Sequence, residues 1–111
     1  IPGIFAKNER VISIFDTEVG AMALILVGAM FVSSIETVWS GVVVPPRARR
    51  VTQVDYSQNT DQIKLIKGEE MGRFNMGSTV IMLFANPSVA WDSHMIKEHS
   101  TALGQRIGAA T

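Results

Sequence analysis

The chain has 111 residues, of which 47% are hydrophobic and 18% are charged, and its formal net charge is +0. This composition is typical of a folded domain with a core and excludes an intrinsically disordered segment. The balanced charge gives no support for a nucleic-acid-binding protein, which usually carries a basic excess. The chain holds no cysteine, so disulfides, thiolate metal sites and cysteine nucleophiles are excluded.

The first part of the chain is predicted to form strands. Residues 1–5 lack the charged start and long apolar stretch of a signal peptide, and the first residue, an isoleucine, suggests that further sequence precedes it. Residues 11–15 are β-branched and aromatic, as in a strand. Residues 21–35 are the most apolar part, but they run for about fifteen residues, fewer than the roughly twenty that cross a bilayer, and Gly28 interrupts them. We expect two buried strands or one kinked strand there, with a membrane helix as the alternative.

Short strands are also expected in the rest of the chain. The runs predicted to be strands are residues 41–44, which end at two prolines, and residues 51–54, 63–66 and 79–84. Residues 86–88 break the pattern, residues 89–103 are expected to carry one helical turn or a loop, and residues 103–108 a further turn and short strand. Strands at roughly ten-residue spacing with glycines at the corners predict an all-β or β-dominated fold, a barrel-like β sandwich of short antiparallel strands.

The stretch best suited to chemistry is residues 74–79, Phe-Asn-Met-Gly-Ser-Thr, which follows a glycine-containing turn at residues 67–72. Ser78 comes directly after Gly77, where the backbone can adopt geometries closed to other residues. A serine held in this way can attack the carbonyl of its own preceding peptide bond to give an ester. Elimination then breaks the chain and leaves dehydroalanine, which hydrolyses to a pyruvoyl group. By itself, however, a Gly-Ser pair more often makes only a turn that leads into a strand.

Residues 68–80, which contain Met-Gly-Ser-Thr, resemble the processing segment of phosphatidylserine decarboxylases, in which an [LM]-Gly-Ser-Thr motif is cut before the serine. A second block resembles the preceding core of the bacterial, proteobacterial-type enzymes: residues 8–11, 15–18, 25–29 and 35–39. The resemblance runs from about Phe5 to Phe84 and fades after Asn86. It implies that residues 1–111 are a single domain, the C-terminal part of a larger α+β catalytic domain.

The resemblance implies a pyruvoyl-dependent decarboxylase that cleaves itself between Gly77 and Ser78. Residues 1–77 would end the β chain and residues 78–111 would form the α chain, with Ser78 as the self-cleavage nucleophile and the precursor of the covalent pyruvoyl cofactor. Through a Schiff base this group would convert phosphatidylserine to phosphatidylethanolamine and CO2. The implied partners are phosphatidylserine, the membrane surface, the other chain of the cleaved enzyme and a second copy in a homodimer. The implied location is peripheral, on the cytoplasmic face of the bacterial inner membrane.

Two features of the family have no match in this sequence. Self-cleavage in the family resembles serine-protease chemistry, with an aspartate and a histidine in a His-Arg-Asp-Tyr-His-like segment upstream of the serine. Nothing before Asn8 matches that segment, and the amphipathic N-terminal helices by which the family sits on the membrane are also missing. These differences leave a non-catalytic β-sandwich carrier or interaction module, or a membrane-embedded segment over residues 21–35, as alternatives.

The other polar residues are weaker candidates. His94 and His99 are five residues apart; on a helix they would point about 140° apart and would not share a metal ion well. They are expected to be ordinary surface or loop residues, with no metal site. Glu69 and Glu70 are adjacent in a turn and are expected to be solvated rather than to act as an acid and a base. A local basic cluster, expected to be a solvated loop or a contact for lipid phosphate, is formed by Arg47, Arg49 and Arg50.

Overall fold

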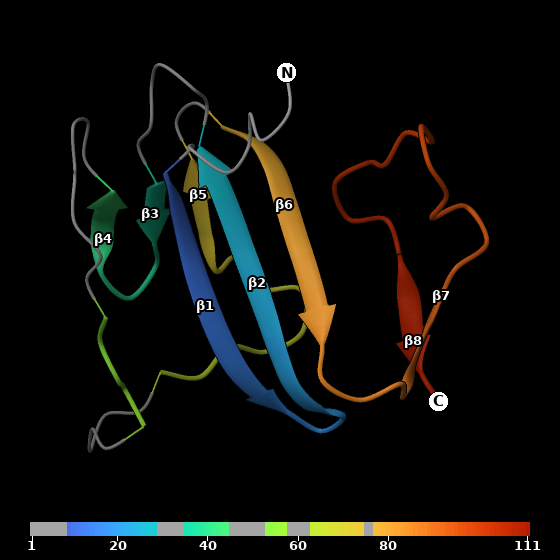
Figure 1. Ribbon diagram of the computed structural model, residues 1–111, viewed down its shortest axis with the longest axis horizontal. Coiled ribbons are helices and arrows are strands. Elements are labelled where there is room, and N and C mark those ends of the chain that lie inside the picture. The colour runs from blue at the N-terminus through green and yellow to red at the C-terminus, as the bar shows by residue number, and fades with distance from the viewer. Residues whose placement is uncertain (1–8, 29–34, 45–52, 58–62, 75–76) are drawn as a thin grey trace. The chain divides into compact units, whose positions relative to one another are not determined.

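The computed structural model describes residues 9–28, 35–44, 53–57, 63–74 and 77–111. Within these ranges all the regular elements are β-strands (Figure 1). The strands are β1 (Arg10–Thr17), β2 (Gly20–Gly28), β3 (Ile35–Thr37), β4 (Gly41–Val44), β5 (Gly72–Phe74), β6 (Gly77–Phe84), β7 (Val89–Trp91) and β8 (Gly108–Ala110). The predicted β-dominated fold is confirmed, although the described strands form three small sheets and do not close into a barrel.

The first sheet has the strand order β1-β2-β6 and contains the longest strands. A two-residue turn joins β1 to β2, and the Thr17 hydroxyl closes it by donating to the Gly20 carbonyl (2.7 Å) and accepting from the Val19 amide (3.1 Å). Gly20 has a φ of +100°, which residues with a Cβ rarely adopt. The glycine therefore fixes the hairpin, and with it the register of β2, the strand that carries β6.

The second sheet has the order β4-β3-β5, with the three-residue strand β3 in the centre. On one side Thr37 lies opposite Gly72 and Glu36 opposite Arg73; on the other, the pairing with β4 shifts register between Ile35 and Glu36. A Cβ on Gly72 would collide with the backbone carbonyl of Glu36 and would lie 3.3 Å from the Thr37 Cα. Glycine is needed at the start of β5 because β3 approaches so closely.

The chain divides into two compact units, residues 1–12 with 25–81 and residues 13–24 with 82–111. The core of the first unit is formed by the buried side chains of Leu26 and Ile35, with Val11 and Met71 packed against them. Ile35 has no exposed surface, and Val27 is 1% exposed. This small cluster joins β1, β2 and β3 to the residue that precedes β5.

The second unit contains the two-stranded antiparallel sheet of β7 and β8, in which Val89 pairs with Ala110 and Trp91 with Gly108. The Trp91 ring also makes an edge-on contact with Phe84 at the end of β6, with ring centroids 5.8 Å apart. Residues 89–91 are therefore a strand, not part of the helical turn or loop expected for residues 89–103.

Most of the strands expected from the sequence lie where the structure has a strand. The strands expected at residues 11–15, 41–44 and 79–84 are confirmed, as is a turn at Gly104. The short strand expected within residues 103–108 lies later in the chain, because residues 105–107 are irregular and β8 begins at Gly108. Residues 21–35 give β2 and the start of β3, with residues 29–34 outside the described ranges. In the described part of the chain no helix is long and apolar enough to cross a membrane.

Two predicted strands are wrong where the structure describes them. Residues 63–66 are irregular, because both backbone groups of Ile66 bond to Glu69 in a local turn: the Glu69 amide donates to the Ile66 carbonyl and the Ile66 amide to Glu69 Oε2, each at 3.0 Å. Residues 53–54, the described end of the expected strand at 51–54, are also irregular, and Val54 is 61% exposed. Apolar runs that find no strand partner stay outside the sheets.

Candidate functional site

Gly77 and Ser78 are the first two residues of β6. They belong to the strand itself and not to a turn that leads into it. The preceding strand, β5, is paired with β3, whereas β6 is paired with β2. The last strand before residues 75–76, which lie outside the described ranges, therefore belongs to one sheet and the first strand after them to another, and the Gly77–Ser78 peptide bond lies at the start of the second strand.

Both flanks of the Gly77–Ser78 bond are anchored by hydrogen bonds to earlier parts of the chain. Upstream, the amide of Val38 donates to the carbonyl of Met71 (2.9 Å), one residue before β5. Downstream, the amide of Ala85 donates to the carbonyl of Ala21 (3.0 Å), one residue after β6. The strands on both sides of the Gly77–Ser78 bond are therefore each fixed to an earlier part of the chain.

The turn before β5 holds the two adjacent carboxylates in separate roles. Glu69 accepts a hydrogen bond from the Ile66 amide (3.0 Å), and Glu70 forms a two-point ion pair with Arg73, Nε to Oε1 at 3.0 Å and Nη2 to Oε2 at 3.2 Å. The side chains of Arg73 and Glu70 are 61% and 53% exposed. The expectation that both carboxylates are solvated is confirmed, and neither has the buried setting that tunes a general acid or base.

Sequence reasoning missed one polar residue near this segment. Thr37 is only 3% exposed, lies opposite Gly72 in the β3–β5 pair, and its hydroxyl has no hydrogen-bond partner among the described residues. The sequence around Thr37 gives no signal of its burial, because that burial depends on pairing with Gly72, which lies 35 residues later in the chain. The structure assigns Thr37 a place beside the anchored segment and no direct chemical role.

His94 and His99 lie in a loop, as expected, because residues 92–107 contain turns and no helix. The two imidazole rings lie close together, with centroids 6.0 Å apart and planes inclined at 60°. Among the described residues there is no group of three or more His, Cys, Asp or Glu side chains arranged to hold a metal ion. The basic cluster at residues 47–50 lies outside the described ranges.

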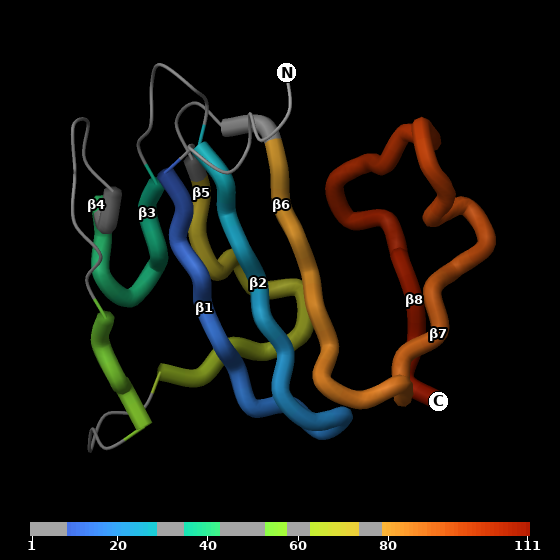
Figure 2. The backbone as a smooth tube through the Cα atoms, in the orientation of Figure 1, coloured from blue at the N-terminus to red at the C-terminus, as the bar shows by residue number. Residues whose placement is uncertain are grey.

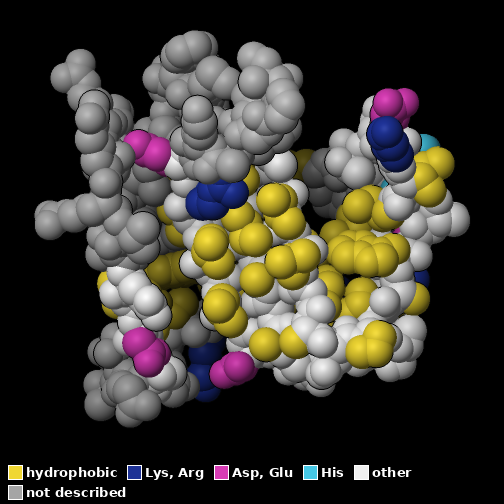
Figure 3. Space-filling model, viewed as in Figure 1, with side chains coloured by type: hydrophobic (Ala, Val, Ile, Leu, Met, Phe, Trp, Pro, Cys, Tyr) yellow, Lys and Arg dark blue, Asp and Glu magenta, His cyan; other side chains and the backbone are white. Residues whose placement is uncertain are grey.

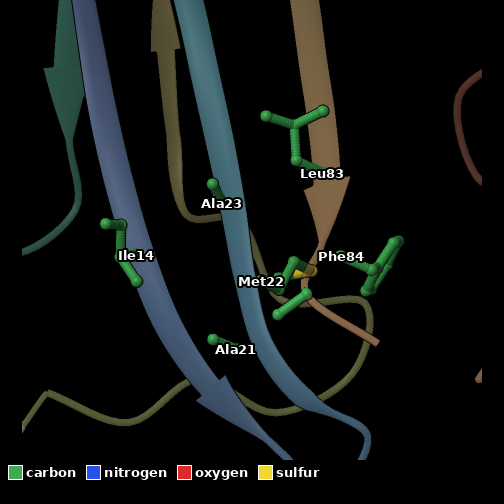
Figure 4. A pocket seen from close by; sticks show the side chains of 7 residues that line it. Ile14, Ala21, Met22, Ala23, Leu83 and Phe84 are labelled. Carbon is green, nitrogen blue, oxygen red and sulfur yellow. The ribbon is translucent and has the colours of Figure 1, made fainter. Parts of the chain in front are cut away.

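The second unit carries a shallow apolar depression with a volume of about 230 Å³ (Figure 4). Hydrophobic side chains also gather on the face that Figure 3 shows. Two side chains that line the depression, those of Ile14 and Leu83, are 74% and 55% exposed. The depression is lined by Ile14, Ala21, Met22, Ala23, Leu83, Phe84 and Ala85. These residues include no ionisable group, so the depression offers contact for an apolar group and no acid–base chemistry.

Comparison with known proteins shows the family to which the chain belongs. The family model described as phosphatidylserine decarboxylase matches residues 1–109. The chain belongs to the phosphatidylserine decarboxylase family. The resemblance recognised in the processing segment is thereby confirmed. It also extends further than the sequence suggested, because the match continues well beyond Asn86.

Curated relatives of this decarboxylase family member are similar over most of its length. The phosphatidylserine decarboxylase proenzyme of Shewanella baltica (strain OS155) is 52% identical over 107 residues, which are 95% of this chain and 37% of that protein. The proenzyme of Vibrio cholerae (strain El Tor Inaba N16961) is 53% identical over 106 residues, again 95% and 37%. That of Shewanella loihica is 57% identical over 90 residues, 80% of this chain and 32% of the relative. The matched part of the chain thus spans about a third of the length of these relatives, from 32% to 37%.

Proposed function

We propose that this chain is the pyruvoyl-bearing part of a phosphatidylserine decarboxylase and that cleavage takes place between Gly77 and Ser78. The observation that carries the proposal is the position of this pair, at the first residues of β6 and between two anchored strands, in a chain of this family. The relatives are named proenzymes, which supports maturation from a precursor.

The local residues fit a pyruvoyl group, because this group can be made from Ser78 itself. Ser78 brings the hydroxyl and Gly77 the acyl group, and without a Cβ on Gly77 less bulk surrounds the carbonyl carbon. Ser78 belongs to β6, a strand that pairs with β2. Once formed, the pyruvoyl ketone supplies an electron sink for the electrons that CO2 leaves behind.

The reacting groups in the cleavage are the Ser78 hydroxyl and the Gly77 carbonyl. The Ser78 hydroxyl oxygen attacks the Gly77 carbonyl carbon; a C–O bond forms, the peptide C–N bond breaks, and the Ser78 nitrogen takes up the proton as a free amine. Elimination across the Ser78 Cα–Cβ bond then releases the Gly77 carboxylate and leaves dehydroalanine. Water replaces the nitrogen, which leaves as ammonia, and the ketone remains. The sequence of steps needs water and no oxidant or reductant.

The two products of this cut are expected to stay together. β6 keeps its pairing with β2, the Ala85 amide keeps its bond to the Ala21 carbonyl (3.0 Å), and the Asn86 side-chain amide donates to the Val19 carbonyl (3.2 Å). Residues 78–111 would therefore remain docked on residues 1–77 after cleavage. The proposal includes phosphatidylserine as substrate, which the relatives' names support. It also includes a homodimer and a peripheral position on the cytoplasmic face of the bacterial inner membrane, both of which follow from the family resemblance.

Mass spectrometry of the purified protein under denaturing conditions tests the proposal. We expect two fragments that divide at Gly77/Ser78, with the downstream fragment lacking a free amine and gaining mass on borohydride reduction. Ser78→Ala should leave one uncut chain that does not decarboxylate phosphatidylserine, while Ser93→Ala, a matched change in an exposed loop, should be cut normally. Cleavage at the same bond in Ser78→Ala would overturn the assignment. An uncut, unreactive full-length protein that includes the upstream histidine used for self-cleavage in the family would favour a non-catalytic module.

A further inference from the structure

The segment between β7 and β8 brings together the two histidines of the chain. The backbone leaves β7, loops away and returns along β8 (Figure 2). At the base of the loop the Asp92 amide donates to the Ile107 carbonyl (2.8 Å), and the Asp92 carboxylate pairs with Arg106 (3.2 Å). The loop is thus closed at its base by a backbone hydrogen bond and an ion pair, and residues 93–105 form its body.

Within the loop, consecutive turns reverse the chain between the two histidines. The Ile96 amide donates to the His94 carbonyl (2.9 Å), and the His99 amide donates to the Ile96 carbonyl (3.2 Å). Glu98 has a φ of +66° and is the one non-glycine residue with positive φ in the described part of the chain. Such a conformation is uncommon for a residue with a Cβ. It turns the backbone so that His99 comes back beside His94.

A hydrogen bond fixes the tautomer of the His99 ring, and one nitrogen of the His94 ring is without a partner among the described residues. His99 Nδ1 lies 3.0 Å from the carbonyl oxygen of Ser100. A carbonyl oxygen can only accept, so Nδ1 carries the hydrogen and Nε2 keeps its lone pair. A carbonyl that fixes the tautomer in this way is the usual support for a histidine that binds a metal. His94 Nε2 is buried and has no hydrogen-bond partner among the described residues.

The separation of the rings suits a shared cation. A metal lies about 2.0–2.1 Å from an imidazole nitrogen, and therefore about 3.2 Å from the ring centre. Two rings on one metal would then have centroids about 5.2 Å apart at a tetrahedral angle and about 6.4 Å apart if they were opposite each other. The observed distance between the His94 and His99 centroids, 6.0 Å, falls within this range.

We propose that His94 and His99 form a two-imidazole site for a divalent cation of the class of Zn²⁺, Ni²⁺ or Cu²⁺. Imidazole is a preferred ligand for these ions. The described residues supply no third ligand, and Asp92 is engaged by Arg106. Water completes the coordination, so binding is exchangeable and chelators remove the ion. A bound cation would link the two ends of the turn at residues 94–99, and the site uses neither Gly77 nor Ser78.

Zinc titration of the ¹⁵N-labelled chain, followed through the imidazole nitrogen resonances, tests this site directly. The chain has two histidines, so there are two rings to follow. Both rings should shift with one common midpoint, and the shift should reverse when a chelator is added. A shift confined to one ring, or no shift in either ring, would overturn the proposal.

Single substitutions provide the second part of the test. His94→Gln and His99→Gln should each weaken zinc binding at least tenfold, because only one imidazole is left to bind the ion. The control is Lys97→Gln, an exposed change inside the same turn, which should leave the zinc affinity within twofold. Unchanged affinity in His99→Gln contradicts a shared site. His99 is exposed, so this variant and the titration of the unaltered chain decide the question even if the partly buried His94 does not tolerate substitution.

Discussion

Replacing Ile35 by alanine tests whether the small core of the first unit holds β3 in place. Ile35 is 0% exposed, and it lies on β3 opposite Phe74 of β5. The substitution removes three buried carbon groups, worth about 0.8 kcal/mol each or about 2.4 kcal/mol together. A cavity of about 80 Å³ that did not relax would add up to about 2 kcal/mol at about 24 cal/mol per Å³. We therefore expect the free energy of unfolding to fall by about 2.4–4.4 kcal/mol.

The matched control is Ile12→Ala, which removes the same atoms from β1. Ile12 is 58% exposed, so about two fifths of the transfer term applies and no closed cavity forms, which gives a loss of about 1 kcal/mol. Urea unfolding followed by tryptophan fluorescence and circular dichroism measures both variants. Because β3 carries β5, Ile35→Ala should also slow cleavage at Gly77–Ser78 more than Ile12→Ala does. Equal stability losses in the two variants would refute this account of the core.

Two further predictions concern local geometry. Gly72→Ala should destabilise the fold by about 1–3 kcal/mol, since the new Cβ meets the backbone of Glu36. The control is Gly104→Ala, whose Cβ would meet no atom within 4 Å but whose φ is +83°; it measures the conformational cost alone, about 1–2 kcal/mol. Unchanged unfolding of Gly72→Ala would contradict the close approach of β3 and β5. Hydrogen bonds from the side chain and then the backbone of Ser57 hold the pKa of Asp55 below its ordinary value, so Ser57→Ala should raise that pKa in a carboxyl ¹³C titration. The lowered pKa stabilises the fold at neutral pH, and this contribution is lost as the pH falls through the pKa of Asp55 in the folded state. An unchanged titration in Ser57→Ala would rule out the Ser57 hydroxyl as the cause.

Local patterns in the sequence were sufficient for several elements. Residues 11–15, 41–44 and 79–84 are strands because β-branched and apolar residues repeat there and turn residues bound them. Family membership could also be recognised from the Gly77–Ser78 segment and the block before it, because the reaction implied needs those residue types in direct sequence. The role of Ser78 stays a prediction that the cleavage experiment tests.

The tertiary structure decided features in which the partner of a group is not fixed by its neighbours in sequence. Ile66 lies in an apolar run, yet its amide and carbonyl bond to Glu69, so no strand forms there. Thr37 is buried because β5 pairs with β3. His94 and His99 meet because Glu98 adopts a left-handed conformation within consecutive turns. A repeating pattern of residues determines the local backbone state, whereas hydrogen bonding and packing between distant segments select which side chains meet.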